Sequence, residues 1–183
     1  MTYAISNLRK SLGTLLRPNN FRVKLSLAST SGRSDQPQIS TISSTFEFRC
    51  EKAELPGRTL ATADDMGSGP SLKLPYDTTY NDIQLSIICA EKMEERIFFE
   101  KWMDFIVKPG DNAWGGTVAF YSDYALGNTL EVSQLNDAGA PVLTYICHHV
   151  YPIAITPMNA TWEEINTYQR FGVTLAYRYH TYK

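Results

Sequence analysis

The sequence places a cysteine and two histidines side by side, at Cys147-His148-His149. Thiolate and imidazole groups are ligands that zinc prefers, and a closed zinc site takes four of them. Adjacent residues on a strand point to opposite faces, so Cys147 and His149 would share a side while His148 faces away. The remaining histidine is His180, and no paired-cysteine motif accompanies it. The ligand set is incomplete, and a metal-dependent enzyme centred on Cys147 and His149 is kept only as an alternative function.

Other arrangements that support catalysis are missing from the sequence. It has neither a Gly-x-Ser-x-Gly nucleophile elbow nor a local cysteine-protease signature, and no phosphate-binding glycine motif opens a helix. The adjacent acids Asp64-Asp65 lie in a glycine-containing segment, where a solvated loop is the simpler interpretation. Glu94-Glu95 are explained by the positive end of a helix dipole. We therefore predict no catalytic, cofactor-binding or metal-binding residue, no cofactor, and a protein that is not an enzyme.

The composition fits one globular domain over residues 1–183. Lysine and arginine total 17 against 19 acidic residues, and no clustered basic face is visible for tight nucleic-acid binding. The longest apolar stretches fall far below the roughly 20 residues that span a bilayer, and residues 1–10 lack the layout of a secretory signal. Three scattered cysteines fit reduced, buried thiols better than a disulfide framework. We expect a protein that stays in the cytoplasm where it is made, with no membrane partner.

Alternation of apolar and polar residues predicts strands along most of the chain. In residues 21–27 the apolar side chains alternate with Arg22, Lys24 and Ser26, which is the period of a half-buried strand. Similar patterns predict strands over residues 45–50, 82–89, 117–121, 129–135, 142–150 and 170–180. A polar, glycine-containing turn over residues 136–141 suits a hairpin loop. With roughly eight strands, the predicted fold is mainly β, an antiparallel β-sandwich or barrel.

One segment, about residues 91–107, has the period of an amphipathic α-helix. Its apolar residues fall on one broad face that would dock on the sheet; they are Phe98, Phe99, Trp102, Met103, Phe105 and Ile106. Three segments lie outside the predicted elements. Residues 1–20 are expected to form an N-terminal arm, and residues 29–44 and 61–70, rich in small and polar residues, to form exposed loops.

Four stretches of the chain resemble one protein family by their order and spacing. A strand enters the turn at Leu55-Pro56, a strand over residues 80–87 precedes a helix with Trp102, a Tyr151-Pro152 step follows, and residues 166–179 form a closing strand. Together they resemble the tail tube protein family of contractile-tailed bacteriophages. That family includes baseplate proteins that start the tube, and it is akin to the inner-tube proteins of bacterial type VI secretion.

The resemblance implies a structural subunit that self-assembles into hexameric, stacked rings and forms the conduit for DNA ejection. It also implies sheath, baseplate and tail terminator proteins as partners, with a tape-measure protein and passing DNA in the lumen without sequence-specific binding. The chain would then belong to the virion tail, assembled in the host cytoplasm. A baseplate tube initiator of the same fold and the inner tube of a type VI secretion-like system stay open as alternatives.

In a tube, the exposed loops are the expected contacts between subunits or rings, because a partner can order an otherwise uncovered loop. The candidate contact residues are Ser31, Gly32, Arg33, Asp35, Asp64, Asp65 and Met66. Two physical arguments agree with a tube. Long alternating strands leave edges that ring closure would pair, and a nearly neutral chain would let DNA slide without sticking.

Overall fold

The computed structural model of the chain describes residues 15–28, 47, 49–65, 69–108, 116–162 and 167–183. Within this part the fold is mainly β, with twelve strands. They form two four-stranded sheets and two two-stranded ribbons, and every pairing is antiparallel. The predicted mainly antiparallel class is confirmed. The two large sheets make a sandwich-like arrangement and do not close into a barrel.

The first sheet, sheet A, contains the strands that alternation predicted over residues 21–27, 129–135 and 142–150. Its order is β1 (Phe21–Ser26), β8 (Thr129–Leu135), β9 (Pro141–His148) and β12 (Tyr179–Tyr182). A hairpin turn joins β8 to β9, as predicted, and in it Asn136 N donates to Ala140 O at 2.9 Å. Gly139 has a φ of +77° in this turn, a conformation that favours glycine.

The second sheet, sheet B, has the order β10 (Tyr151–Ile155), β11 (Arg170–Ala176), β5 (Ile83–Ile88) and β2 (Cys50–Ala53). The predicted strand over residues 82–89 is confirmed as β5. The single strand predicted over residues 170–180 is wrong, because the chain leaves sheet B after β11 and enters sheet A as β12. Arg178 N donates to His148 O at 3.0 Å where it crosses. Alternation continues through the crossing, so the sequence pattern did not reveal it.

Two further strand predictions need correction. Of residues 45–50, Glu47 and Arg49 have helical backbone, and the strand begins only at Cys50. Of residues 117–121, only β7 (Thr117–Val118) is a strand; it pairs with β6 (Val107–Lys108), and helix α4 (Tyr121–Tyr124) follows. Apolar alternation over five or six residues is too short to distinguish a strand from a turn of helix.

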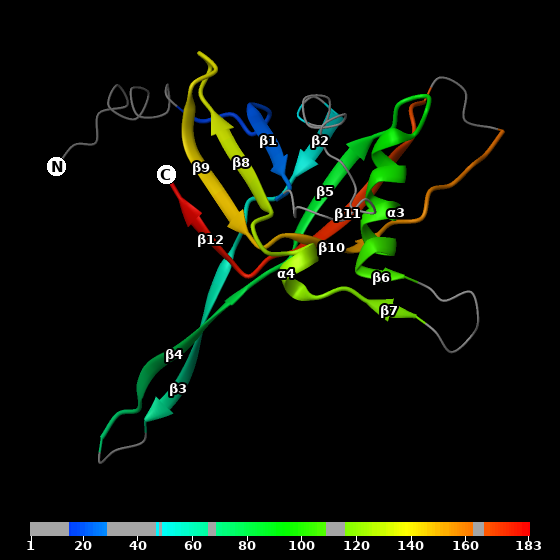
Figure 1. Cartoon of the computed structure of the whole chain (residues 1–183). Helices are drawn as coiled ribbons and strands as arrows, with labels where there is room; N and C mark the ends of the chain where they lie inside the picture. Colours follow the sequence, from blue (N-terminus) through cyan, green and yellow to red (C-terminus); the bar gives the residue numbers. More distant parts are fainter. Residues whose placement is uncertain (1–14, 29–46, 48, 66–68, 109–115, 163–166) are drawn as a thin grey trace, which may run out of the picture.

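One apolar core joins both sheets and helix α3 (Glu94–Ile106), which lies beside β5 and β11 in Figure 1. Phe171 of β11 pairs directly with Ile87 of β5, and the Phe99 ring of α3 meets the Phe171 ring with centroids 6.2 Å apart. The predicted apolar face of α3 is confirmed, since Phe98, Phe99 and Trp102 are buried. Burying each large apolar side chain contributes about 1.5–3 kcal/mol.

Helix α3 starts at Glu94, later than predicted, after Met93 in a left-handed conformation. Glu94 is exposed in the first turn, as a helix-dipole role requires. Glu95 has a different role, because its side chain is 1% exposed and pairs with the Arg49 guanidinium. Its second oxygen accepts a hydrogen bond from Ala90 N at 3.2 Å. The buried carboxylate thus ties the segment before β2 to the start of α3.

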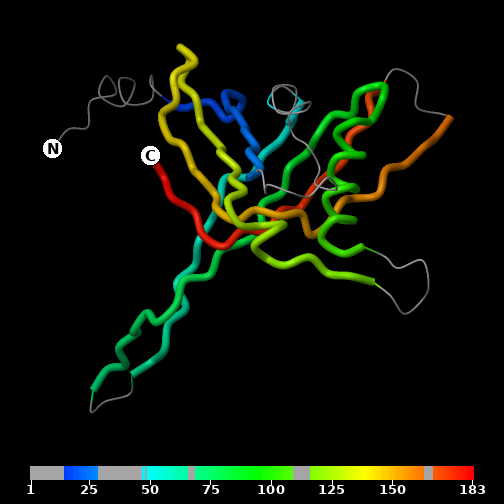
Figure 2. Tube along the Cα trace, in the orientation of Figure 1, coloured from blue at the N-terminus to red at the C-terminus, as the bar shows by residue number. Residues whose placement is uncertain are grey.

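A long ribbon of β3 (Arg58–Asp65) and β4 (Leu72–Tyr80), called the arm below, runs away from both sheets (Figures 1 and 2). The loop predicted over residues 61–70 is therefore wrong for residues 61–65, which form the end of β3. The strand was missed because both of its faces are exposed, so its residues do not alternate in polarity. In the described part of the chain, no helix has the length and apolar character to cross a membrane.

Candidate assembly site

The arm exposes apolar side chains that the described part of the chain leaves uncovered. Four of them are between about half and three-quarters exposed: Leu60 58%, Leu72 60%, Leu74 46% and Tyr76 72%. An isolated two-stranded hairpin is marginally stable in water, and a third strand or a packed face is needed to hold it. The arm has the composition of a surface that another molecule covers.

The register of the arm places two of its leucines, Leu72 and Leu74, in a stripe near its end. Residues directly opposite each other in an antiparallel pair share a face. Leu74 lies opposite Ala63, and Leu72 lies opposite Asp65, so both leucines and this acid share one face. Further back, the register shifts between Ala61 and Thr62. The arm therefore presents a short apolar stripe that ends in a carboxylate.

A cluster of aromatic rings, called the arm base below, joins the arm to sheet A and to the connection between β11 and β12. The His180 ring of β12 lies 5.2 Å from the Tyr80 ring of β4, 5.5 Å from Tyr145 of β9 and 6.0 Å from Tyr177, centroid to centroid. The Tyr177 hydroxyl donates to Gly57 O, just before the arm, at 3.3 Å. Tilted and edge-on ring contacts of this kind contribute about 0.5–1.5 kcal/mol each. They fix the direction in which the arm leaves the body.

The environment of His180 favours its neutral form. Burial lowers the pKa of His180 below its usual 6.5, and the positive charge of Arg58 lowers this pKa further. The buried Nδ1 of His180 has no hydrogen-bond partner within the described part of the chain. The side chain acts as an aromatic packing group between the arm and sheet A.

Cys147 and His149, the centre of the alternative metal site, are not joined by further ligands in the described part of the chain. Cys147 is fully buried in the core, and burial raises the pKa of its thiol to about 12. The His148 ring stacks on Tyr179 at 4.6 Å. His149 lies beyond the end of β9 with a φ of 60°, so strand alternation no longer applies to it. Among the described residues, no group of three or more His, Cys, Asp or Glu side chains could hold a metal ion.

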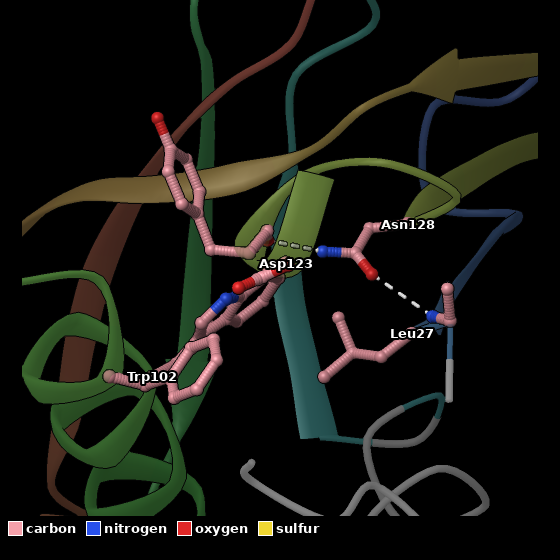
Figure 3. Close-up of a pocket in the computed structure, with 7 residues that line it drawn as sticks. Leu27, Trp102, Asp123 and Asn128 are labelled. Atoms are coloured by element: carbon pink, nitrogen blue, oxygen red, sulfur yellow. Dashed lines mark hydrogen bonds between the residues drawn. The ribbon is translucent and has the colours of Figure 1, made fainter. Parts of the chain in front are cut away.

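A small pocket near α4 serves packing rather than ligand binding (Figure 3). Its volume of about 20 Å³ is room for roughly one water molecule. Buried Asn128 forms one wall and ties three segments together. Its amide nitrogen donates to Tyr124 O at 2.6 Å and to Val150 O at 3.2 Å, and its oxygen accepts from Ala28 N at 3.0 Å. The pocket lies between α3, α4 and the segment that follows β1.

The predicted contact residues fall in two groups. Asp64 and Asp65 are exposed on β3 near the end of the arm. The others, Ser31, Gly32, Arg33, Asp35 and Met66, lie outside the described residues. The apolar residues of β4 were not predicted as contacts, although Leu72, Leu74 and Tyr76 alternate with Lys73 and Pro75. Proline is rare within strands, but Pro75 lies next to the register shift of the arm, where the ladder is already interrupted.

A model of the phage tail tube protein family matches residues 16–183. Among curated proteins, the tail tube protein gp19 of Enterobacteria phage T4 is 23% identical over 167 residues, which cover 91% of each chain. The family match spans the two sheets, the arm and helix α3.

Two solved structures share the fold. A chain of the anti-feeding prophage baseplate superposes with a TM-score of 0.63 at 13% identity, covering 93% of this chain and 96% of that one. A chain of the sheath–tube complex of an extracellular contractile injection system, in its extended state, gives a TM-score of 0.60 at 14% identity. That alignment covers 100% of this chain and 99% of the other.

Proposed function

The chain belongs to the phage tail tube protein family, and from this premise we propose that copies of it join into closed rings that stack into the tube of a contractile tail. The observation that supports this proposal is the arm, an exposed two-stranded ribbon with uncovered leucines and a tyrosine. Such a ribbon gains stability when a second copy covers it. The chain is a structural component of a virion tail, and the proposal gives it no catalytic role.

Open strand edges provide a second reason for self-assembly. Among the described strands, β1 and β12 are the edges of sheet A, and β10 and β2 are the edges of sheet B. An edge strand has unpaired backbone groups that can pair with another chain. A small barrel closed by one chain is filled by its own side chains, so a channel as wide as DNA needs strands from several subunits. Six copies in a ring, as the family resemblance implies, would supply them.

The partners of the chain follow from the proposed tube. The relative in phage T4 is named a tail tube protein, and one structure with this fold is a sheath–tube complex. We propose a sheath protein around the tube, baseplate and terminator proteins at its ends, and a tape-measure protein or DNA inside. With 17 basic and 19 acidic residues, the chain suits a conduit that DNA traverses without sequence-specific binding. The particle would be assembled in the host cytoplasm.

The candidate contact residues fit this assembly in two ways. Asp64 and Asp65 near the end of the arm would meet a neighbouring subunit. Residues 29–44, with Ser31, Gly32, Arg33 and Asp35, and Met66 are proposed as further contacts between subunits or rings, because polar connections can order against a partner.

Negative-stain microscopy of the purified protein tests the proposal. We expect rings of uniform diameter and tubes made of stacked rings, with the protein about as abundant as the sheath protein in intact particles. A protein that stays monomeric at high concentration would contradict the proposal. Single rings that never stack, present at one ring per particle, would instead indicate a tube initiator at the baseplate.

A further inference from the structure

The three histidines of the chain lie around the point where it crosses from sheet B to sheet A. His148 ends β9, and His149 follows it. His180 lies on β12, directly opposite Cys147 of β9. We name the three histidines the histidine cluster. Since β12 is the outer strand beside β9 (Figure 1), the cluster lies where this strand joins the sheet.

Histidine contacts hold β12 on both of its faces. On one face the His148 ring stacks on Tyr179 with centroids 4.6 Å apart, and its Nε2 lies 3.1 Å from Thr181 Oγ1. On the other face His180 packs among the rings of the arm base. Strand β12 has four residues and, in the described sheet, one neighbouring strand, so its hydrogen-bond ladder is short. Its attachment therefore depends on these side-chain contacts.

Two of the imidazoles have no acceptor for a second proton. The Nδ1 atoms of His149 and His180 are buried and have no hydrogen-bond partner in the described part of the chain. A neutral imidazole can keep its single proton on Nε2, whereas an imidazolium has a proton on both nitrogens. The buried Nδ1–H would then be a donor without an acceptor, which destabilises the folded state.

Protonation would also add positive charge beside positive charge. Burial lowers the pKa of His180 below its usual 6.5, and the charge of Arg58 lowers this pKa further. Burial and then the adjacent histidine lower the pKa of His148. Arg178 is a further cation in this region, because burial raises the pKa of Tyr121 and the charge of Arg178 opposes that shift. Acid would therefore charge both faces of β12.

The other groups around the cluster do not neutralise this charge. The rings that face it are phenols: Tyr80, Tyr121, Tyr145, Tyr177 and Tyr179. Burial raises the pKa of Tyr177 to about 12, and the carboxylate of Asp82 makes one of the smaller contributions. On the outer face of sheet A, Glu131 of β8 lies directly opposite Lys24. The two lowered histidine pKa values respond to neither acid.

We propose that the histidine cluster is an acid-sensitive switch, whose protonation releases β12 and the arm base from sheet A while the core of the two sheets stays folded. The central strands β5, β8 and β11 contain no histidine, so the change is local. Because the folded-state pKa values of His148 and His180 are lowered, β12 is fully attached above about pH 6.5 and is released as the pH falls through those values.

The switch has a consequence for the tube, and this part of the inference rests on the proposed function. Strand β12 is an open edge of sheet A, and the arm is the candidate assembly site. Their release removes both from the position in which a neighbouring copy would meet them. Tubes formed near pH 8 should therefore come apart near pH 5.

Hydrogen exchange by mass spectrometry on the unassembled full chain tests the switch without requiring a tube. The chain is labelled at about pH 8 and about pH 5, with labelling times scaled to equal intrinsic exchange. We expect the amides of residues 178–183 to exchange about tenfold faster at pH 5 and those of β5 and β11 to be unchanged. Equal exchange of residues 178–183 at both pH values overturns the inference, and so does an equal acceleration in all strands.

Two sets of variants assign the effect to the histidines. A double variant with His148→Phe and His180→Phe keeps both rings without titration, and its β12 should stay slow at pH 5. His180→Lys carries the charge at pH 8 and should release β12 there, whereas the matched control His180→Met has a similar unbranched chain without charge and should not. A double variant as acid-sensitive as the parent, or equal exchange in the Lys and Met variants, overturns the inference.

Microscopy of assembled tubes separates this inference from the proposed function. Parent tubes moved from pH 8 to pH 5 should dissociate, and tubes of the double variant should persist. Parent tubes that stay intact at pH 5 overturn control of assembly by the cluster and leave the proposed function standing. A parent chain that never assembles overturns the proposed function, while the exchange experiment still decides whether acid releases β12.

Discussion

At the scale of single residues, His180 connects the arm to the body of the protein. Tyr80 approaches it from β4, Tyr145 from β9, and Tyr177 from the chain between β11 and β12. Charged Arg58 of β3 is also close enough to lower the pKa of His180. A proton on this ring would introduce a second positive charge into a largely aromatic environment.

We therefore expect acid to weaken the arm base. Because burial lowers the folded-state pKa of His180 below its usual 6.5, the unfolded chain binds the proton at a higher pH than the folded chain does. The contribution of His180 to the free energy of unfolding is intact above about pH 6.5 and is lost as the pH falls through the folded-state pKa. His180→Phe keeps the ring and removes the titration, so urea unfolding at about pH 8 and about pH 5 should show a smaller loss for this variant.

His148 also has a lowered pKa, so it contributes to the acid-induced loss of unfolding free energy in this comparison. Burial and then the neighbouring His149 lower the pKa of His148, so part of the acid effect should remain in the His180→Phe variant. A His148→Phe variant measures that part separately. An equal loss of unfolding free energy between the two pH values in the parent and in His180→Phe would show that protonation of His180 does not weaken the arm base.

At the scale of elements, the arm should be dispensable for folding and essential for assembly. Leu60 and Thr78 are direct cross-strand partners, so an Asn-Gly turn in place of residues 61–77 would join them as a short hairpin. Most of the removed side chains are exposed. A substitution at an exposed position usually changes the free energy of unfolding by less than about 0.5 kcal/mol. We expect the thermal midpoint to stay close to that of the parent while rings and tubes disappear, as seen by calorimetry and microscopy.

The control for the shortened arm is Val142→Ser, which removes an exposed apolar group from β9 and leaves the arm intact. It should assemble like the parent. A shortened protein that still forms tubes would remove the arm from the assembly contacts. A large drop in its thermal midpoint would instead assign the arm to the folding core.

At the scale of the whole molecule, stability should be unevenly distributed. Strands β5, β8 and β11 are central in their sheets and contain most of the buried strand residues, whereas the arm has almost none. Hydrogen exchange by mass spectrometry should find slow amides in these three strands and fast amides in the arm of the unassembled chain. On assembly the arm should slow by about tenfold or more, because a partner then covers it. Equal exchange in both states would contradict a role for the arm in the contact.

The candidate site was predictable only in part, and the reason lies in its exposure. Asp64 and Asp65 were predicted as exposed, and the structure agrees, but they lie on a strand rather than in a loop. The residues of β3 show no apolar alternation, and in β4 the alternation of Leu72, Leu74 and Tyr76 does not mark a buried face, because both strands of the arm are largely exposed. The arm base was hidden for another reason, because Tyr80 and His180 are a hundred residues apart in the sequence and meet only through the packing of β4 against β12.

The sequence by itself determined the local elements and the family. Strands β1, β5 and β8 and the buried face of α3 follow from periodicity, because burying one face requires apolar residues at regular spacing. Only the tertiary structure decided which strands share a sheet, where the chain crosses between Ala176 and Tyr179, and that residues 58–80 leave the body as an arm. Those features depend on contacts between distant residues, and such contacts leave no period in a single sequence.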